Sequence, residues 1–221
     1  MSIHNQSPRQ ISESFLLSGL LAVSGGFQDA YTYNIRDHVF SNAQTGNVVL
    51  MSQNFMSGNW LTGLSYMVPL FAFALGIMVT EQIEHHLKMM SRLHWRQLIL
   101  LLEIVVLFAV GFIPSSFNMI ATMLVSFSCS MQVQAFRKVN GFPYASTMCI
   151  GNLRSGTESL SVFLREKNKK ALIKAMHYYG IILLFALGAG LGGICTLAIG
   201  ITAIWISCAL LLVGCIFMAK G

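Results

Sequence analysis

Charged residues are scarce in this sequence, and their scarcity argues against a soluble domain. Asp, Glu, Lys and Arg together make up 10% of the 221 residues, whereas about 25% is usual in soluble domains. Hydrophobic residues reach 55%, and the mean hydropathy is +0.65. The composition therefore indicates an integral membrane protein that forms a single membrane domain over residues 1–221.

Paired cysteines, metal motifs and catalytic motifs are also missing. The five cysteines are scattered through apolar segments without CxxC spacing, which argues against disulfides and a zinc site; they are Cys129, Cys149, Cys195, Cys208 and Cys215. The sequence contains no phosphate loop, nucleophile elbow or zinc-protease motif. We therefore expect no enzyme activity, no cofactor and no metal. The net charge is +6. Its basic residues lie in short connections between apolar segments, where Lys and Arg set the orientation of membrane helices, so nucleic-acid binding is not expected.

Six apolar segments are long enough to cross a bilayer, which takes roughly 20 residues. They cover 15–36, 65–84, 97–113, 116–136, 176–198 and 200–218. Two less apolar segments, 39–57 and 143–164, each carry a Gly-Asn motif. If all eight crossed, the basic residues of 88–96 and 165–174 would lie on opposite faces, against the tendency of Lys and Arg to stay cytoplasmic. We therefore predict an all-α, polytopic membrane helix bundle with six crossings, cytoplasmic termini and two polar segments that do not cross.

The Gly-Asn motifs belong to an internal repeat. Gly46-Asn47 recurs 105 residues later as Gly151-Asn152, and the same shift places Asp29 on Gln134. The repeat halves, 15–113 and 116–218, contain three predicted crossings each, so the second half is inverted relative to the first. Inverted repeats are typical of secondary transporters, whose sites lie near the midplane on broken helices. The alternative is a duplication that reflects only how membrane proteins grow.

Carboxyl groups inside apolar segments are the strongest candidates for function. Asp29 lies within the first apolar segment, where an unpaired carboxylate costs on the order of 2.5 to 3.5 kcal/mol. Glu103 is flanked by apolar residues on both sides. Because desolvation disfavours a charged carboxyl, Asp29 and Glu103 could couple transport to protons, although structural roles are the alternative for both. Arg36 is expected at the membrane interface, where its side chain can reach water.

The polar segments predict a solute site shared by both halves. Their amides and small residues can expose polar groups where a helix breaks; close packing through glycine with interhelical amide bonds is the alternative. The predicted substrate-binding residues are Gln28, Asp29, Tyr33, Thr45, Gly46, Asn47, Gln132, Gln134, Gly151 and Asn152.

Four motifs resemble those of the YoaK family of bacterial membrane proteins, sometimes labelled small-molecule permeases. They are GGFQDA (25–30), QTGN (44–47), MQVQAFR (131–137) and GNLRSG (151–156). The resemblance covers nearly the whole chain and implies a bacterial inner-membrane location. It implies no particular substrate or catalytic residue. Ile150 departs from the threonine usual before the second Gly-Asn, which argues against a symmetric hydroxyl role there.

These patterns together predict a small permease or secondary transporter, surrounded by membrane lipid, that moves an unknown small solute. Two copies could be needed to enclose a pathway, so a homodimer is one expectation. The alternative is a non-transporting membrane protein that binds a lipid or a protein partner.

Overall fold

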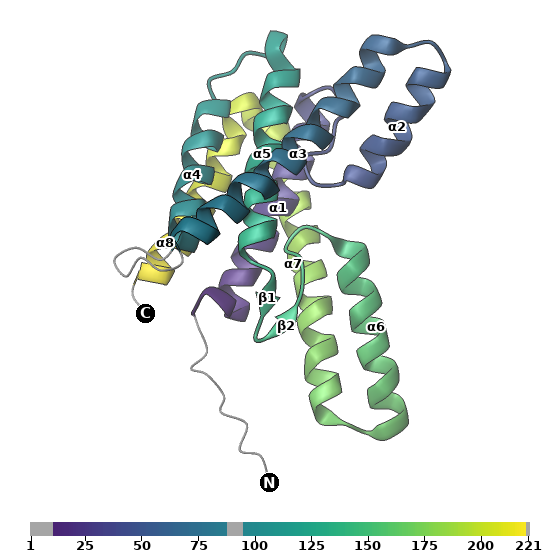
Figure 1. Cartoon of the computed structure of the whole chain (residues 1–221), viewed down its shortest axis with the longest axis vertical. Helices are drawn as coiled ribbons and strands as arrows, with labels where there is room; N and C mark the ends of the chain where they lie inside the picture. The colour runs from purple at the N-terminus through teal and green to yellow at the C-terminus, as the bar shows by residue number, and fades with distance from the viewer. Residues whose placement is uncertain (1–10, 88–94, 220–221) are drawn as a thin grey trace.

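The computed structural model describes residues 11–87 and 95–219, most of them in α-helices (Figure 1). In chain order the helices are α1 (Phe15–Ile35), α2 (Gln44–Met56), α3 (Trp60–Leu87), α4 (Trp95–Val110), α5 (Asn118–Ala135), α6 (Cys149–Glu166), α7 (Lys169–Ile199) and α8 (Ile204–Ala219). The shorter elements are the 3-10 turns η1 (Ile11–Glu13), η2 (Ser115–Phe117) and η3 (Gly200–Ala203) and the hairpin β1 (Lys138–Val139) and β2 (Phe142–Pro143). The described chain is therefore an all-α bundle, as predicted.

Every apolar segment predicted from the sequence contains a helix. The two Gly-Asn segments also contain helices, but these begin late, at Gln44 and at Cys149. Within the described residues, two helical stretches are long and apolar enough to cross a membrane, Trp60–Leu87 and Lys169–Ala219. The second stretch consists of α7, η3 and α8.

Small residues let two pairs of helices approach closely. Helix α1 packs along α7 and α3 packs along α5. A side chain at Gly188 would collide with the backbone of Val23, and a Cβ at Gly192 would lie 2.8 Å from the carbonyl oxygen of Phe27. Gly76 of α3 lies in the same way against the backbone of α5. Close approach of this kind is how helices associate where no hydrophobic force acts between them.

Two helical hairpins project from the bundle in opposite directions. In Figure 1, α2 and the first part of α3 extend toward the upper right, whereas α6 and the first part of α7 extend downward. Each hairpin is held by contact between its own two helices. As a result, α2 and α6 each lie at the edge of the molecule while their first residues point toward its centre.

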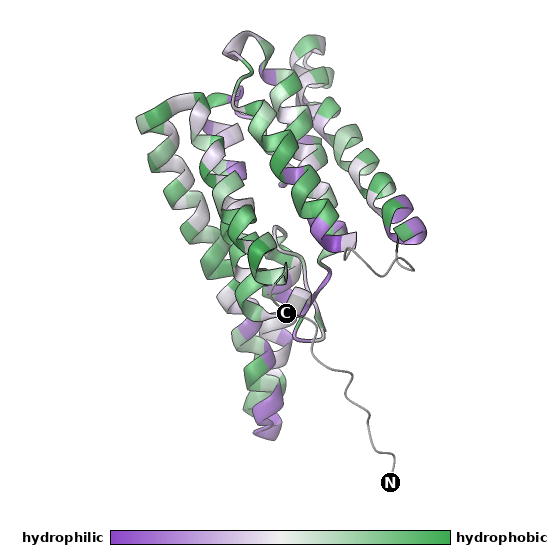
Figure 2. Cartoon of the chain, turned by 90° about the vertical axis from the view of Figure 1, so that its left-hand side faces the viewer, coloured by the Kyte–Doolittle hydropathy of each residue, from purple (hydrophilic) through white to green (hydrophobic). Residues whose placement is uncertain are grey.

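The outer faces of the helices are apolar. Leu197 is 82% exposed, Ile194 69% and Phe71 68%, and Figure 2 shows hydrophobic residues along the outside of most helices. Hydrophilic residues gather at the far end of the α6–α7 hairpin (Figure 2). Because soluble monomers rarely expose large continuous apolar patches, this surface suits lipid tails better than water.

Arg36 ties the end of α1 to its neighbours and does not reach water. Its side chain is fully buried, and it donates to Asn118 Oδ1 at 3.0 Å, to the carbonyl oxygen of Val110 at 3.2 Å and to the Tyr31 hydroxyl at 2.8 Å. Asn118 in turn donates to Asp37 at 2.7 Å. The predicted access of the Arg36 side chain to water is therefore wrong, because α4 and α5 supply hydrogen-bond acceptors that its sequence position does not reveal.

Candidate functional site

The loop that follows α1 folds back along the helix to its middle. Asn42 donates through its backbone nitrogen to Asp29 Oδ1 at 2.7 Å and through Nδ2 to the carbonyl oxygen of Gly25 at 3.2 Å. Ser41 Oγ donates to the same carboxylate oxygen at 2.9 Å. Gly25 precedes Ile35 by ten residues, or about 15 Å of helix. Helix α2 therefore begins beside the middle of α1.

The loop that follows α5 reaches the same part of α1. Gln132 Nε2 donates to Ser146 Oγ at 2.8 Å and to the carbonyl oxygen of Leu21 at 3.3 Å. The methyl group of Thr147 lies directly against Gly25, where a Cβ would collide with it. Helix α6 therefore also begins at this level of α1.

One face of α1 contacts both loops. Leu21, Gly25 and Asp29 are spaced four residues apart, which puts them on one face of the helix, over about 12 Å. Residues 41–42 and 146–147 meet along this face. We call the group of polar side chains gathered there the central site: Asp29, Ser41, Asn42, Gln132, Ser146 and Thr147.

The two motif asparagines hold the loops. Asn47 Nδ2 donates to the carbonyl oxygen of Phe40 at 2.7 Å, and the Phe40 backbone nitrogen donates back to Oδ1 at 3.3 Å. Asn152 makes the same pair of bonds with Ala145, at 2.7 and 3.4 Å. Asn47 and Asn152 thus shape the loops of the central site, and their amide groups are occupied in doing so.

The motif glycines do not mediate close helix packing. A Cβ at Gly46 would meet only the Phe40 ring at 3.5 Å, an ordinary contact, and a Cβ at Gly151 would meet nothing within 4 Å. The close-packing alternative for these two glycines is therefore wrong. Both lie in the first turn of their helices, at the edge of the central site.

Three buried polar atoms of the central site have no hydrogen-bond partner among the described residues. They are Asn42 Oδ1, Gln132 Oε1 and Thr147 Oγ1, on side chains that are 4%, 1% and 6% exposed. The orientation of both amides is determined, because each nitrogen donates to a backbone carbonyl oxygen, which can only accept. The atoms without partners are therefore the amide oxygens.

A second polar cluster lies beside the central site, around Gln28. Its Nε2 lies 3.0 Å from Ser24 Oγ, 3.2 Å from Ser207 Oγ and 3.3 Å from Glu103 Oε1. The thiol of Cys129 donates to Gln28 Oε1 at 2.6 Å. Glu103 is fully buried, and its Oε2 has no partner in the described part of the chain. The cluster joins α1, α4, α5 and α8 inside the bundle.

Besides the motif glycines and asparagines, three predicted site residues lie outside both clusters. Tyr33 is 41% exposed and stacks on Phe40, with the ring centroids 4.8 Å apart. Thr45 is exposed on the first turn of α2. Gln134 bonds to Glu81 of α3.

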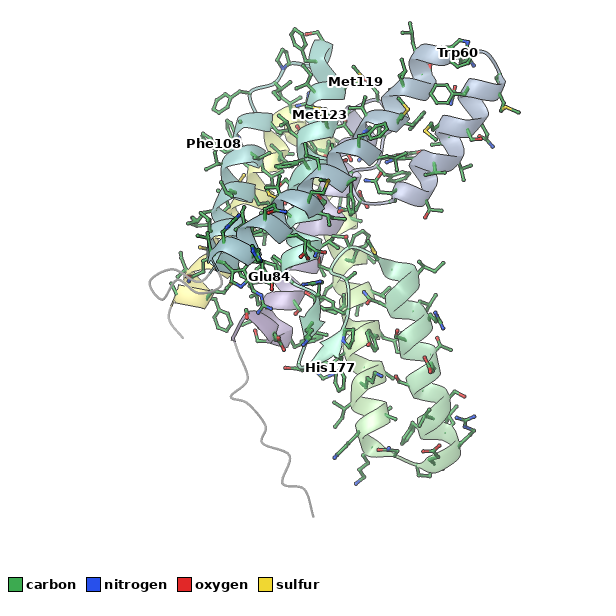
Figure 3. All side chains as sticks on the ribbon, in the orientation of Figure 1. Trp60, Glu84, Phe108, Met119, Met123 and His177 are labelled. Carbon is green, nitrogen blue, oxygen red and sulfur yellow. The ribbon has the colours of Figure 1, made fainter. Side chains whose placement is uncertain are left out.

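Gln132 contacts its loop serine in the way that Asp29 contacts its own. Asp29 and Ser41 are 12 residues apart, whereas Gln132 and Ser146 are 14 apart. The stretch from the helix residue to its loop serine is therefore two residues longer in the second half, and an alignment without gaps selects Gln134 instead. Gln134 lies near an ion pair at the surface, where Arg137 bonds to Glu84 at 3.3 Å. Figure 3 shows Glu84 toward the opposite end of α3 from Trp60.

Four residues of the central site are missing from the predicted set, and two of them, Asn42 and Thr147, carry atoms without a hydrogen-bond partner among the described residues. They are related by the same shift of 105 that relates Asn47 to Asn152, and each lies five residues before its motif asparagine. This shared spacing is the signal that could have identified them. Ser41 and Ser146 are related in the same way.

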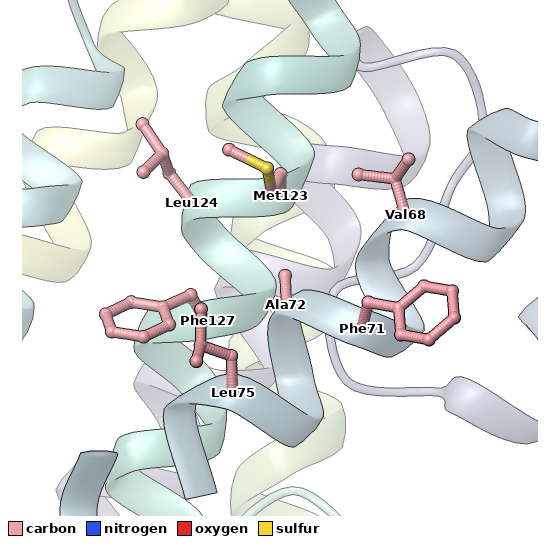
Figure 4. A pocket seen from close by; sticks show the side chains of 7 residues that line it. All are labelled: Val68, Phe71, Ala72, Leu75, Met123, Leu124 and Phe127. Carbon is pink, nitrogen blue, oxygen red and sulfur yellow. The ribbon is translucent and has the colours of Figure 1, made fainter. Parts of the chain in front are cut away.

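An apolar groove of about 400 Å³ lies between α3 and α5 (Figure 4). It is lined by Val68, Phe71, Ala72, Leu75, Met123, Leu124 and Phe127. The groove has no charged residue in its lining, so its walls suit a hydrocarbon chain.

The chain was compared with known proteins. A family model described as "Protein of unknown function (DUF1275)" matches residues 17–217, which include both loops of the central site. No curated protein and no solved structure matches the chain.

Proposed function

The chain belongs to the DUF1275 family of proteins of unknown function, and we propose that it is a small-solute permease of the bacterial inner membrane that works by alternating access. One observation carries this proposal: α2 and α6 begin at the same point of α1 and run toward opposite ends of the bundle. In secondary transporters, solute sites lie where discontinuous helices meet near the midplane. The central site would then be the solute site.

The proposed membrane arrangement has six crossings, made by α1, α3, α4, α5, α7 and α8. Helix α2 has 13 residues, or about 20 Å, too short for a hydrocarbon core of about 30 Å. If α2 starts in the middle of the membrane, its length is enough to reach the membrane surface. Non-helical backbone at such a depth is tolerated where it is buried in protein or lines a cavity, and residues 41–42 and 146–147 are buried.

The helix contacts support an inverted repeat. If α1 to α4 correspond to α5 to α8, the pair α1–α7 corresponds to α5–α3, and α2–α3 corresponds to α6–α7. All four pairs are in contact. Helices α4 and α8 correspond to each other and also pack together. The central site would lie between the two halves and open to either side as they rock.

Glu103 is the proposed proton-binding group, next to the solute site. It bonds to Gln28, the neighbour of Asp29 in the sequence, and its second carboxyl oxygen has no partner among the described residues. Intramembrane carboxyls of this kind commonly form proton relays in transporters.

Two-sided accessibility of the central site tests the proposal. In a background without native cysteines, Thr147→Cys would be treated with a membrane-impermeant thiol reagent in right-side-out and inverted vesicles. An alternating-access carrier should react from both sides. Ser57→Cys and Lys169→Cys, at the tips of the two hairpins, are the matched controls, and each should react from one side only, outside and cytoplasmic respectively. Reaction of Thr147→Cys from neither side, or from one alone, would contradict alternating access.

A second candidate function is lipid binding without transport, which the groove between α3 and α5 favours. A lipid chain in the groove should be displaced by Met123→Trp, which fills the space, so less lipid should be recovered with the purified protein. Under this function alone, Thr147→Cys should react from neither side.

A further inference from the structure

We infer that the solute carries a protonated primary amine, which the central site recognises by accepting its hydrogen bonds. This inference rests on the proposed function, because it names the class of molecule that the site would move.

The unpartnered amide groups of the central site are both acceptors. Asn42 Oδ1 and Gln132 Oε1 are buried without a hydrogen-bond partner in the described residues, while the nitrogen of each amide is already used. A buried polar atom without a partner costs free energy and calls for an explanation such as an absent ligand or ion. A ligand that completes these two groups must donate hydrogen bonds.

Asp29 is the one acidic or basic residue of the central site, so the site is negative when this carboxyl is ionised. Asp29 takes part in none of the salt bridges found among residues 11–87 and 95–219. The fully buried Arg36, which directly follows α1, bonds instead to Asn118 at the start of α5. The bonds to the Asp29 carboxylate come from a hydroxyl and a backbone nitrogen, and both reach Oδ1. A buried carboxylate is stabilised by a cation, so the ligand should be positively charged.

A primary ammonium group meets both requirements. It carries a positive charge and three hydrogen-bond donors and has no acceptor. The central site offers one carboxylate and two amide oxygens, with the Thr147 hydroxyl as a further possible acceptor. The number of donors therefore matches the acceptors that the two loops and α1 supply.

The helix starts near the site could instead attract an anion, because helix N-termini carry a partial positive charge. At α2, however, the Asp29 carboxylate already accepts the Asn42 backbone N–H just before the helix. An anionic solute would lie beside this carboxylate and be repelled by it. The acceptor-rich side chains and the charge of Asp29 both favour a cation.

Thermal unfolding of the full chain in detergent, with added salts at equal ionic strength, tests the inference. Methylammonium chloride should raise the unfolding temperature in a saturable way. Tetramethylammonium chloride has the same charge but no N–H donor, and it should have no such effect. Sodium chloride and sodium acetate serve as the alkali-cation and anion arms and should also have none.

Variants link the effect to the site. Gln132→Leu should raise the apparent Kd for methylammonium by about tenfold or more, the usual loss for a hydrogen bond to a charged group. Gln134→Leu makes the same change two residues away on α5, outside the site, and should leave the Kd unchanged. Asp29→Asn should abolish binding, whereas Glu158→Gln, at an exposed carboxyl, should not. If Gln132→Leu does not fold, Asn42→Ala replaces it and should weaken binding similarly.

Several results would overturn the inference. Equal stabilisation by tetramethylammonium or sodium would show that the central site does not recognise N–H donors. A methylammonium Kd unaffected by Gln132→Leu and Asn42→Ala would show the same. Stabilisation by acetate that is lost in Gln132→Leu would replace the amine with an anion and leave the proposed permease intact. Conversely, methylammonium binding as expected, with Thr147→Cys reactive from one side only, would keep the amine and remove alternating access. No stabilisation by any of the four salts would also overturn the inference.

Discussion

Asn47 and Asn152 close their loops with the same two hydrogen bonds. Each donates through Nδ2, at 2.7 Å, to the carbonyl oxygen seven residues earlier, and each accepts the N–H of that same residue. The pairs lie 105 residues apart in the sequence and shape the two loops that meet on α1. Each asparagine side chain thus gives the loop backbone hydrogen bonds in place of those that a helix or sheet would supply.

The first prediction concerns these loops. Asn47→Leu and Asn152→Leu should each lower the free energy of unfolding by about 1–3 kcal/mol, because each leaves a partly buried backbone donor and acceptor without its partner. Asn→Asp at either position should also destabilise, since a carboxylate cannot donate to the carbonyl oxygen. Thermal or denaturant unfolding in detergent measures the change. Asn59→Leu, at an exposed position, is the control and should change stability little; a similar loss there would contradict the assignment.

A second prediction concerns the buried arginine. Arg36→Ala should lower the free energy of unfolding by about 2–5 kcal/mol, because it leaves several buried acceptors of α1, α4 and α5 without a donor. Arg36→Lys should recover only part of this loss, since an ammonium cannot reproduce the fixed planar fork of a guanidinium. Arg154→Ala removes an exposed arginine and is the matched control. Wild-type stability of Arg36→Ala would contradict the prediction, and wild-type stability of Arg36→Lys would indicate that the fork geometry contributes nothing here.

A third prediction concerns the contact of α1 with α7. Gly188→Ala should destabilise the protein because its methyl group would collide with the backbone of Val23. Gly190→Ala, two residues away on the same helix with nothing within 4 Å of the added Cβ, should be neutral or stabilising by about 0.4–1 kcal/mol. The two variants should therefore change the unfolding temperature in clearly different ways. Destabilisation of the same size at both positions would mean that glycine flexibility, and not the close helix contact, is what matters.

A fourth prediction separates the members of the Gln28 cluster. Glu103→Gln and Glu103→Leu should each change stability by less than about 1 kcal/mol, because the two N–H groups of Gln28 still have Ser24 and Ser207 as acceptors and no buried carboxyl remains to be desolvated. Gln28→Leu should cost about 1–3 kcal/mol, since it leaves several buried groups unpaired.

Unfolding measurements on the three variants test this prediction. If the Glu103→Gln protein is stable but has lost pH-dependent solute uptake, Glu103 is the group that binds the transported proton. Severe unfolding of Glu103→Gln would instead point to a structural role.

The fold followed from the sequence to a large extent, and the candidate site only in part. Long apolar segments form helices because a helix satisfies the backbone hydrogen bonds of an apolar segment internally. All six predicted apolar segments contain a helix. The polar segments were correctly set apart by composition, but their helices begin only after Asn42 and Thr147. Such boundaries depend on hydrogen bonds to a distant helix, which composition does not express.

Within the site, residues fixed by their own helix could be predicted and residues fixed by loop geometry could not. Asp29 and Gln132 lie at the centre, as expected of polar side chains inside apolar helices. Gln134 and Tyr33 point elsewhere, because a shift of one or two residues along a helix turns a side chain away from its neighbours. Because the stretch from the helix residue to the serine is two residues longer in the second half, Gln132, and not Gln134, contacts its loop serine.

By itself, the sequence determined that this chain is an apolar, all-helical protein with a repeated Gly-Asn motif, since hydrophobicity and repetition are properties of the chain alone. The tertiary structure decided that both loops meet at Gly25, that the two motif asparagines hold these loops, and that Arg36 is buried. For the second loop and for Arg36, the physical reason is that the bonds from Gln132 to Leu21 and from Arg36 to Asn118 join residues far apart in the sequence and form only once α1 and α5 are packed together. Those bonds select which polar atoms are satisfied and which are left without a partner among the described residues.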